Sequence, residues 1–183
     1  MIAIRESSKA ALCGIISALA VVVMLTTYIS PFLVYTAPAF SGLLLLLILN
    51  EVGYGWTIGS YFTISALSVF LIADKEAAVF FSMFFGYYPI LAYFFMTRIS
   101  RKSVAWLLKV PVFNISCLIS LLVCFYVFGI GFEDLYSEGI DYTIIFVILL
   151  NVFFVVYDIL ILRLQELYVK KFRKRFRKLF NIR

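Results

Sequence analysis

The sequence predicts an all-α, polytopic membrane protein with six transmembrane helices and a C-terminal basic amphipathic helix. Hydrophobic residues make up 64% of the 183-residue chain and charged residues only 14%, whereas about a quarter of a soluble domain is charged. The apolar residues also gather in long runs separated by short polar joints. A helix rises ~1.5 Å per residue and the hydrocarbon core is ~30 Å thick, so about 20 residues suffice to cross it. The runs cover residues 10–29, 31–49, 52–73, 77–97, 104–130 and 142–162.

The chain is expected to form one membrane domain over residues 1–162, followed by a cytoplasmic tail over 163–183. No linker or insertion between the runs is long enough to fold separately. Of the 16 Lys and Arg residues, 15 fall on the side of the two termini, and the opposite joints are mainly acidic. The positive-inside rule then predicts a multi-pass protein of the cell membrane with both termini in the cytoplasm.

The first run carries a strip of small residues with a spacing of four. Ala10, Gly14 and Ala18 recur on one helical face. In lipid, helices associate by close backbone approach, which small residues permit. The strip is compatible with two interpretations, packing against a helix of the same chain or docking of another membrane subunit.

Two ionisable residues lie inside the last two runs. Lys109 begins the fifth run just before Pro111, and Asp158 lies near the end of the sixth. Because the fifth run starts and the sixth ends on the cytoplasmic side, the two side chains are expected at one depth, where they can pair. Charges in hydrocarbon are costly unless paired. The pair is either a structural tie between the helices or part of a coupling or proton-relay device.

The opposite ends of the first four runs resemble the mouth of a binding site. Asp74 is placed to cap the fourth helix, and the Gly-Tyr-Tyr-Pro stretch that begins at Gly86 predicts a kink in it. Buried tyrosines need hydrogen-bond partners. We expect a small ligand to be enclosed from outside. Lys75 is the one external basic residue, so an anionic or carbonyl-bearing ligand would have it as a partner, unless Lys75 simply pairs with its acidic neighbours. The expected ligand-binding residues are Tyr35, Lys75, Glu76, Tyr87 and Tyr88.

The C-terminal tail combines aromatic and basic residues at helical spacing. This pattern predicts a helix that lies on the inner leaflet, with aromatic residues inserted and basic residues at anionic headgroups. Nucleic-acid binding is the competing interpretation, and direct attachment to a membrane span favours lipid. The predicted lipid-facing residues are Lys170, Lys171, Phe172, Arg173, Lys174, Phe176 and Arg177.

The three cysteines are scattered within the runs without CxxC spacing, and the chain has no histidine. We therefore expect no metal site and no cofactor. An intramembrane enzyme would need ionisable groups clustered at one level. With one deep aspartate and no histidine, enzymatic activity is not expected.

In length, topology and the small-residue first helix that opens with Lys9-Ala10-Ala11, the chain resembles the substrate-binding S components of energy-coupling-factor transporters. The stretches Asp74-Lys75-Glu76-Ala77-Ala78 and Phe85-Gly86-Tyr87-Tyr88-Pro89-Ile90 are similar to an uncharacterised Firmicutes group of S-component-like proteins. The resemblance implies capture of a micronutrient.

It also implies dependence on a transmembrane coupling subunit, docked at Ala10, Gly14 and Ala18, and on separate ATPase subunits. The chain has no nucleotide-binding loop of its own. The alternative is a small structural or scaffold membrane protein without a transported ligand.

Overall fold

The computed structural model describes residues 6–99, 102–129, 136–137, 140–141 and 143–172. Nearly all of these residues are helical, apart from a two-residue strand pair, β1 (Tyr136–Ser137) and β2 (Ile140–Asp141). Two short segments, η2 and η4, are π-helical and one, η1, is a 3-10 turn. The helical elements are α1 (Glu6–Leu25), η1 (Thr26–Ile29), α2 (Leu33–Glu51), α3 (Tyr54–Leu71), α4 (Lys75–Phe80), η2 (Phe81–Phe85), α5 (Tyr88–Arg98), α6 (Lys102–Phe128), α7 (Thr143–Leu167) and η4 (Tyr168–Phe172).

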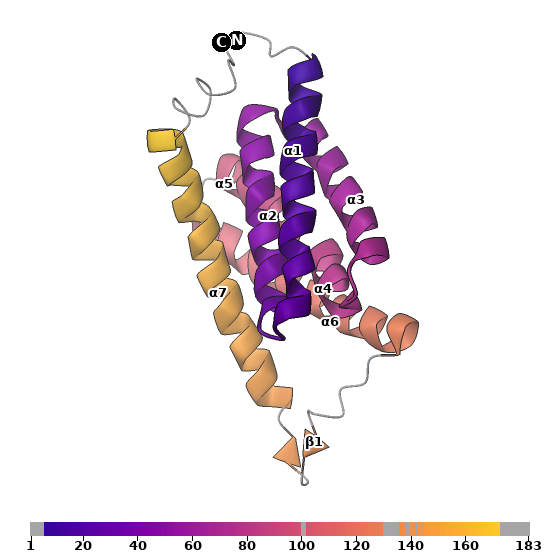
Figure 1. Ribbon diagram of the computed structural model, residues 1–183. Helices are drawn as coiled ribbons and strands as arrows, with labels where there is room; N and C mark the ends of the chain where they lie inside the picture. Colours follow the sequence, from indigo (N-terminus) through magenta and orange to yellow (C-terminus); the bar gives the residue numbers. More distant parts are fainter. Residues whose placement is uncertain (1–5, 100–101, 130–135, 138–139, 142, 173–183) are drawn as a thin grey trace.

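The helices run up and down a single bundle (Figure 1). The first turn of α1 and the last turn of α7 lie at one end, here called the terminal end. The strand pair lies beyond the other end, here called the hairpin end. Helices α1 and α2 stand in front with α3 beside α1, α7 forms one edge, and α6 runs obliquely behind.

Five helical stretches in the described part of the chain are long and apolar enough to cross a membrane, which makes this a multi-pass membrane protein. They are Glu6–Ile29, Leu33–Glu51, Lys75–Arg98, Val104–Phe128 and Val147–Lys171. The third expected span is present as α3, but it is not one of the five. Half of its 18 residues are Gly, Ser, Thr or Tyr, which lowers its hydropathy.

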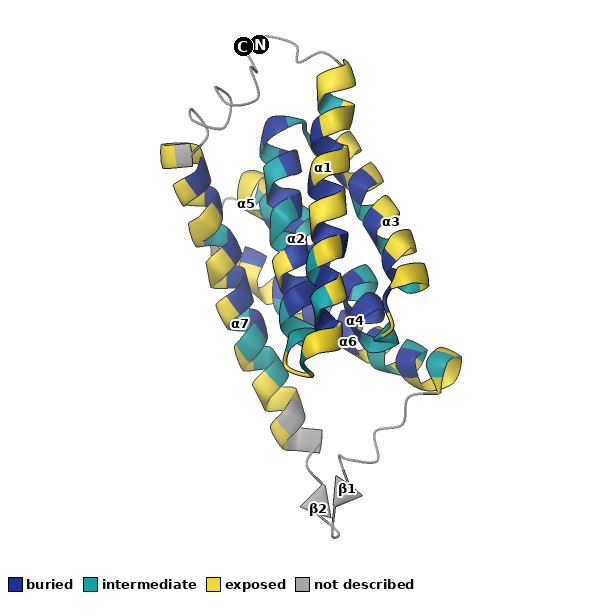
Figure 2. Cartoon of the chain, viewed as in Figure 1, coloured by how far each residue is buried: buried dark blue, intermediate teal, exposed yellow. Residues whose placement is uncertain are grey.

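The core is built on aromatic side chains, most of them contributed by α4, η2 and the start of α5. The fully buried rings are those of Phe80, Phe81, Phe84, Tyr88, Phe113 and Phe154. The rings of Phe113 and Phe154 stack with centroids 4.5 Å apart, which joins α6 to α7. Figure 2 shows the buried residues concentrated where α2, α4 and α7 face the interior.

The stretch Lys75–Arg98, which corresponds to the fourth expected span, is interrupted by the π-helical turn η2 where the sequence predicts a kink. The Gly86 N–H donates to the Phe81 carbonyl at 2.8 Å, five residues back. A Cβ on Gly86 would lie 2.6 Å from the Tyr61 ring, so only glycine allows α3 to pack at this point. Pro89 follows in the first turn of α5, where its missing N–H costs nothing. The Asp74 side chain makes no capping hydrogen bond at the start of α4, contrary to the sequence prediction.

A second glycine brings three elements together near the middle of the bundle. A Cβ on Gly42 would collide with the Phe85 carbonyl oxygen and would lie 2.7 Å from the Tyr157 hydroxyl. The Tyr157 hydroxyl donates to the Ala39 carbonyl at 3.2 Å. Gly42 therefore lets α2 approach both η2 and α7 closely.

Candidate functional site

A cavity of about 620 Å³ lies in the hairpin-end half of the bundle, between α2, α4–η2, α6 and α7. We call it the aromatic cavity, because half of its lining residues are Phe or Tyr. Its volume is in the range of small-molecule sites. The lining residues are Pro31, Phe32, Tyr35, Thr36, Phe80, Phe84, Phe85, Phe113, Cys117, Leu149, Leu150, Val152, Phe153 and Val156.

Two of the expected ligand-binding residues meet at the edge of this cavity. The Tyr35 hydroxyl donates to Glu76 Oε1 at 2.5 Å, across 41 positions of sequence. The Tyr35 ring also packs edge-on against Phe80, with centroids 5.3 Å apart. The contact therefore fastens the start of α2 to α4 and places one phenol in the cavity wall.

Lys75 was expected to offer a free ammonium to a ligand, but its ammonium is already hydrogen-bonded to backbone carbonyls. Its Nζ donates to the carbonyls of Val69 and Ile72, both at 2.8 Å. These carbonyls lie at the C-terminal end of α3, where such groups lack helical partners. Lys75 thus closes the turn between α3 and α4, and it does not line the aromatic cavity.

Tyr87, which immediately precedes α5, and Tyr88, its first residue, lie behind the cavity wall and bind different partners. The hydroxyl of Tyr87 forms a hydrogen bond with Ser116 Oγ on α6. The hydroxyl of Tyr88 donates to Asp158 Oδ1 at 2.6 Å. The ring of Phe84, which does line the cavity, lies 4.8 Å from the Tyr88 ring. The five expected ligand-binding residues therefore do not form one mouth: Tyr35 and Glu76 are in contact, whereas the other three bind separate partners.

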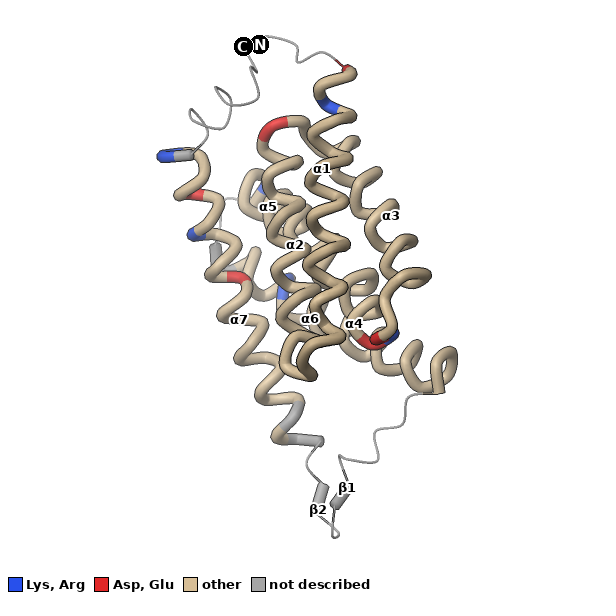
Figure 3. Tube along the Cα trace, viewed as in Figure 1, with Lys and Arg blue, Asp and Glu red and all other residues tan. Residues whose placement is uncertain are grey.

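Lys109 and Asp158 lie in contact, as the sequence predicts. Lys109 Nζ is 2.7 Å from Asp158 Oδ1, and the two side chains are 6% and 1% exposed. With Tyr88 they form a buried polar cluster that links α5, α6 and α7. Asp158 Oδ1 accepts both hydrogen bonds, and Oδ2 accepts none from any described residue. Figure 3 shows how few charged positions lie along the middle of the bundle.

A second polar contact joins α6 and α7 nearer the cavity. Asn114 and Asn151 exchange amide hydrogen bonds of 3.1 and 3.2 Å. Both residues also donate to the carbonyl four residues earlier in their own helix. Their amides are therefore satisfied without a ligand.

The small-residue strip of α1 faces outward. Ala10, Gly14 and Ala18 are all exposed, and a Cβ on Gly14 would meet nothing within 4 Å. The strip therefore does not pack against another described helix of the chain.

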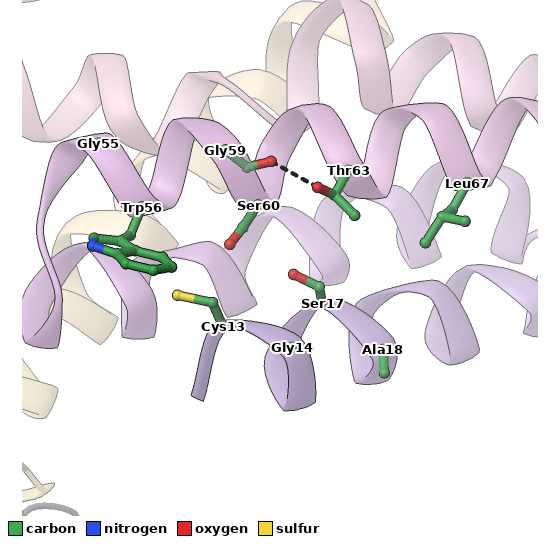
Figure 4. Close-up of a pocket in the computed structure, with 10 residues that line it drawn as sticks. All are labelled: Cys13, Gly14, Ser17, Ala18, Gly55, Trp56, Gly59, Ser60, Thr63 and Leu67. Carbon is green, nitrogen blue, oxygen red and sulfur yellow. Dashed lines mark hydrogen bonds between the residues drawn. The ribbon is translucent and has the colours of Figure 1, made fainter. Parts of the chain in front are cut away.

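Gly14 and Ala18 border a second hollow, of about 600 Å³, between α1 and α3. Gly55 and Gly59 line its α3 side, and a Cβ on either would also meet nothing within 4 Å. Cys13 of α1 points toward α3, whereas Ala18 points away from it (Figure 4).

The basic tail is described only at its beginning. Lys170 and Lys171 are exposed on the π-helical turn η4, and Lys170 Nζ lies 3.8 Å from Glu166 Oε2. The side chain of Phe172, and the whole of Arg173, Lys174, Phe176 and Arg177, lie outside the description. The predicted lipid-surface helix therefore stays a prediction.

Sequence reasoning missed most of the cavity wall, including Phe80, Phe113 and Phe153. The sequence did not single these residues out, because the chain has 20 Phe and the sequence pattern around a buried Phe is the same as that around a lipid-facing one. Among the described residues, no group of three or more His, Cys, Asp and Glu side chains could hold a metal ion.

Comparison of the chain with protein-family models, with curated proteins and with solved structures finds no significant match.

Proposed function

We propose that this chain is a membrane-embedded substrate-capture subunit, similar to the S components of energy-coupling-factor transporters. In this role it binds a small molecule from the extracellular side and relies on separate coupling and ATPase subunits for uptake. We propose that the protein lies in the cell membrane with both termini in the cytoplasm, and that α3 also crosses the membrane, which brings the total to six spans. The hairpin end then faces outward.

The aromatic cavity is the observation that carries this proposal. It has the volume of a small-molecule site and lies in the hairpin-end half of the bundle, between four segments distant in sequence. Its inner wall is fully packed, since Phe80, Phe84 and Phe113 are each at most 2% exposed. A protein that served only as a scaffold would gain nothing from leaving such a space unfilled, because lost van der Waals contacts destabilise a bundle.

The outward-facing strip on α1 supports the proposed dependence on a separate coupling subunit. In lipid, an exposed face of Ala10, Gly14 and Ala18 permits close approach of another transmembrane helix. A coupling subunit is the partner that the resemblance implies, with ATPase subunits reached through it. Lipid covers the rest of the bundle surface, and no nucleic-acid partner is proposed.

Native mass spectrometry of gently purified protein tests capture directly. We expect wild-type protein to retain a small molecule in near-stoichiometric amount. Val152→Trp should lose it, because Val152 lines the cavity and is 55% exposed, so that the larger ring can fill the mouth without disturbing the core. Val147→Trp is the matched control, since Val147 lies on the same helix, is 44% exposed and does not line the cavity.

A wild-type protein that carries no small molecule from its native membrane, while staying folded and monodisperse, would contradict the proposal. That outcome would favour the scaffold alternative. A molecule retained equally by both tryptophan variants would place the binding site elsewhere in the chain.

A further inference from the structure

The chemistry of the cavity wall restricts what the aromatic cavity can hold. Only Tyr35, Thr36 and Cys117 bring polar side-chain atoms to the described lining. The Tyr35 hydroxyl donates to Glu76, and the Thr36 hydroxyl donates to the Phe32 carbonyl at 3.1 Å. A thiol is a weak hydrogen-bonding group. The wall therefore carries no charged side chain and little free hydrogen-bonding capacity.

This wall disfavours a polar or anionic ligand. Each polar group that leaves water without a new partner costs about 1–3 kcal/mol. Apolar surface, by contrast, gains about 25 cal/mol for each Å² removed from water. Lys75, the basic residue expected to attract an anion, is bound to two carbonyls and lies outside the lining.

The mouth of the cavity opens on the side of the bundle. Its inner residues are buried, whereas its rim residues are strongly exposed: Phe32 at 77%, Leu149 at 61%, Val152 at 55% and Val156 at 59%. Three of these four rim residues lie on α7, the helix that forms one edge of the bundle in Figure 2. The side of a membrane bundle faces lipid, so an apolar molecule dissolved in the bilayer can reach the cavity directly.

The volume and the lining of the cavity favour a ring-bearing body. Its volume of about 620 Å³ is in the range of small-molecule sites. Seven of the lining residues are aromatic, and ring faces and edges pack well against other rings.

We propose that the aromatic cavity binds an uncharged, ring-bearing hydrophobic molecule that enters between α2 and α7 from the bilayer, in the hairpin-end half that the proposed orientation places on the extracellular side. This inference rests on the proposed capture function and names the class of molecule captured. It replaces the anionic or carbonyl-bearing ligand that the sequence suggested through Lys75. Ring stacking and burial supply the affinity, and the Tyr35–Glu76 contact closes the end of the cavity.

Two fluorescent probes that differ by one charged group test this inference. N-phenyl-1-naphthylamine is uncharged, and 8-anilino-1-naphthalenesulfonate is the same ring system with a sulfonate. Binding to protein in lipid nanodiscs is followed by energy transfer from tryptophan, with empty nanodiscs as background. We expect saturable binding of the uncharged probe, and at least tenfold weaker binding of the sulfonate.

The tryptophan variants of α7 locate the site. Val152→Trp should weaken the uncharged probe at least tenfold, and Val147→Trp, which adds the same donor to the same helix, should leave its affinity unchanged. Gel filtration checks that both variants remain folded. Equal affinity in the two variants would overturn the assignment to this cavity.

The failure of this inference is distinguishable from the failure of the capture function. Saturable binding of the sulfonate that is lost in Lys75→Ala would overturn the apolar class and restore the polar mouth. A polar molecule found in wild-type protein by native mass spectrometry would likewise overturn the apolar class while leaving capture intact. The absence of both a retained molecule and saturable probe binding would overturn both proposals.

Discussion

The buried Lys109–Asp158 pair allows the sharpest quantitative prediction. Lys109→Met removes the ammonium and leaves a carboxylate that is 1% exposed with Tyr88 as its remaining hydrogen-bond donor. Removing one partner of a buried ion pair costs about 3–5 kcal/mol, because the other charge stays buried and uncompensated. We therefore expect the free energy of unfolding to fall by about that amount. Asp158→Leu should cost about as much.

Removing both charges should recover most of this loss. In Lys109→Met/Asp158→Leu neither charge of the pair remains, and the main residual cost is the Tyr88 hydroxyl without its acceptor, about 1–3 kcal/mol. Adding Tyr88→Phe removes that group as well, so the triple variant should approach wild-type stability. The double variant should thus be more stable than either single variant, with a coupling energy of several kcal/mol.

Unfolding by SDS titration in mixed micelles, read by circular dichroism, measures these free energies. Asn114→Leu and Asn151→Leu form the matched control cycle, since this uncharged pair also bridges α6 and α7. Hydrogen bonds between membrane helices average ~0.6 kcal/mol and reach ~1.7 kcal/mol. If Lys109→Met destabilises no more than Asn114→Leu, or if the charged double variant shows no recovery, the charge argument is wrong.

Three further predictions concern the surface and the topology. Gly14→Leu should leave the protein folded and abolish co-purification with a coupling subunit, whereas Gly42→Leu should abolish folding, because its Cβ would collide with η2. Gel filtration measures folding and a pull-down measures co-purification. Loss of folded Gly14→Leu protein would contradict the assignment of the strip to the exposed surface. On a cysteine-free background in intact cells, an impermeant thiol reagent should label Ser137→Cys and spare Asn181→Cys, and the reverse pattern would invert the orientation. A peptide of residues 168–183 should become helical on anionic liposomes, with binding that weakens as salt rises; equal binding to neutral liposomes would revive a protein or nucleic-acid partner.

The membrane spans could be predicted from sequence because the requirement that produces them is local. Every segment that crosses lipid must satisfy its own backbone hydrogen bonds and carry enough apolar side chains, and both conditions are visible in about 20 consecutive residues. The kink near Gly86 was predictable for the same reason, since Gly and Pro act on their own backbone. Helix α3 marks the limit of this reasoning, because its small and hydroxyl residues lower its hydropathy below that of the five stretches.

The Lys109–Asp158 contact was also within reach of the sequence. Two opposite charges at one depth on consecutive antiparallel helices have few other partners in hydrocarbon, and the structure places them 2.7 Å apart. The third member of the cluster, Tyr88, was expected at a ligand mouth instead. A tyrosine has one hydroxyl and many possible acceptors, so its partner depends on the rotation of its helix.

The sequence by itself determined the all-helical membrane fold class and predicted the Lys109–Asp158 contact, because hydropathy and charge act along the chain. Only the tertiary structure decided which faces of the helices meet. Lipid tails are as apolar as leucine, so buried and lipid-facing positions share one composition and leave no amphipathic period to read. The aromatic cavity, the outward face of Gly14 and the commitment of Lys75 to backbone carbonyls therefore emerged only when the helices were packed.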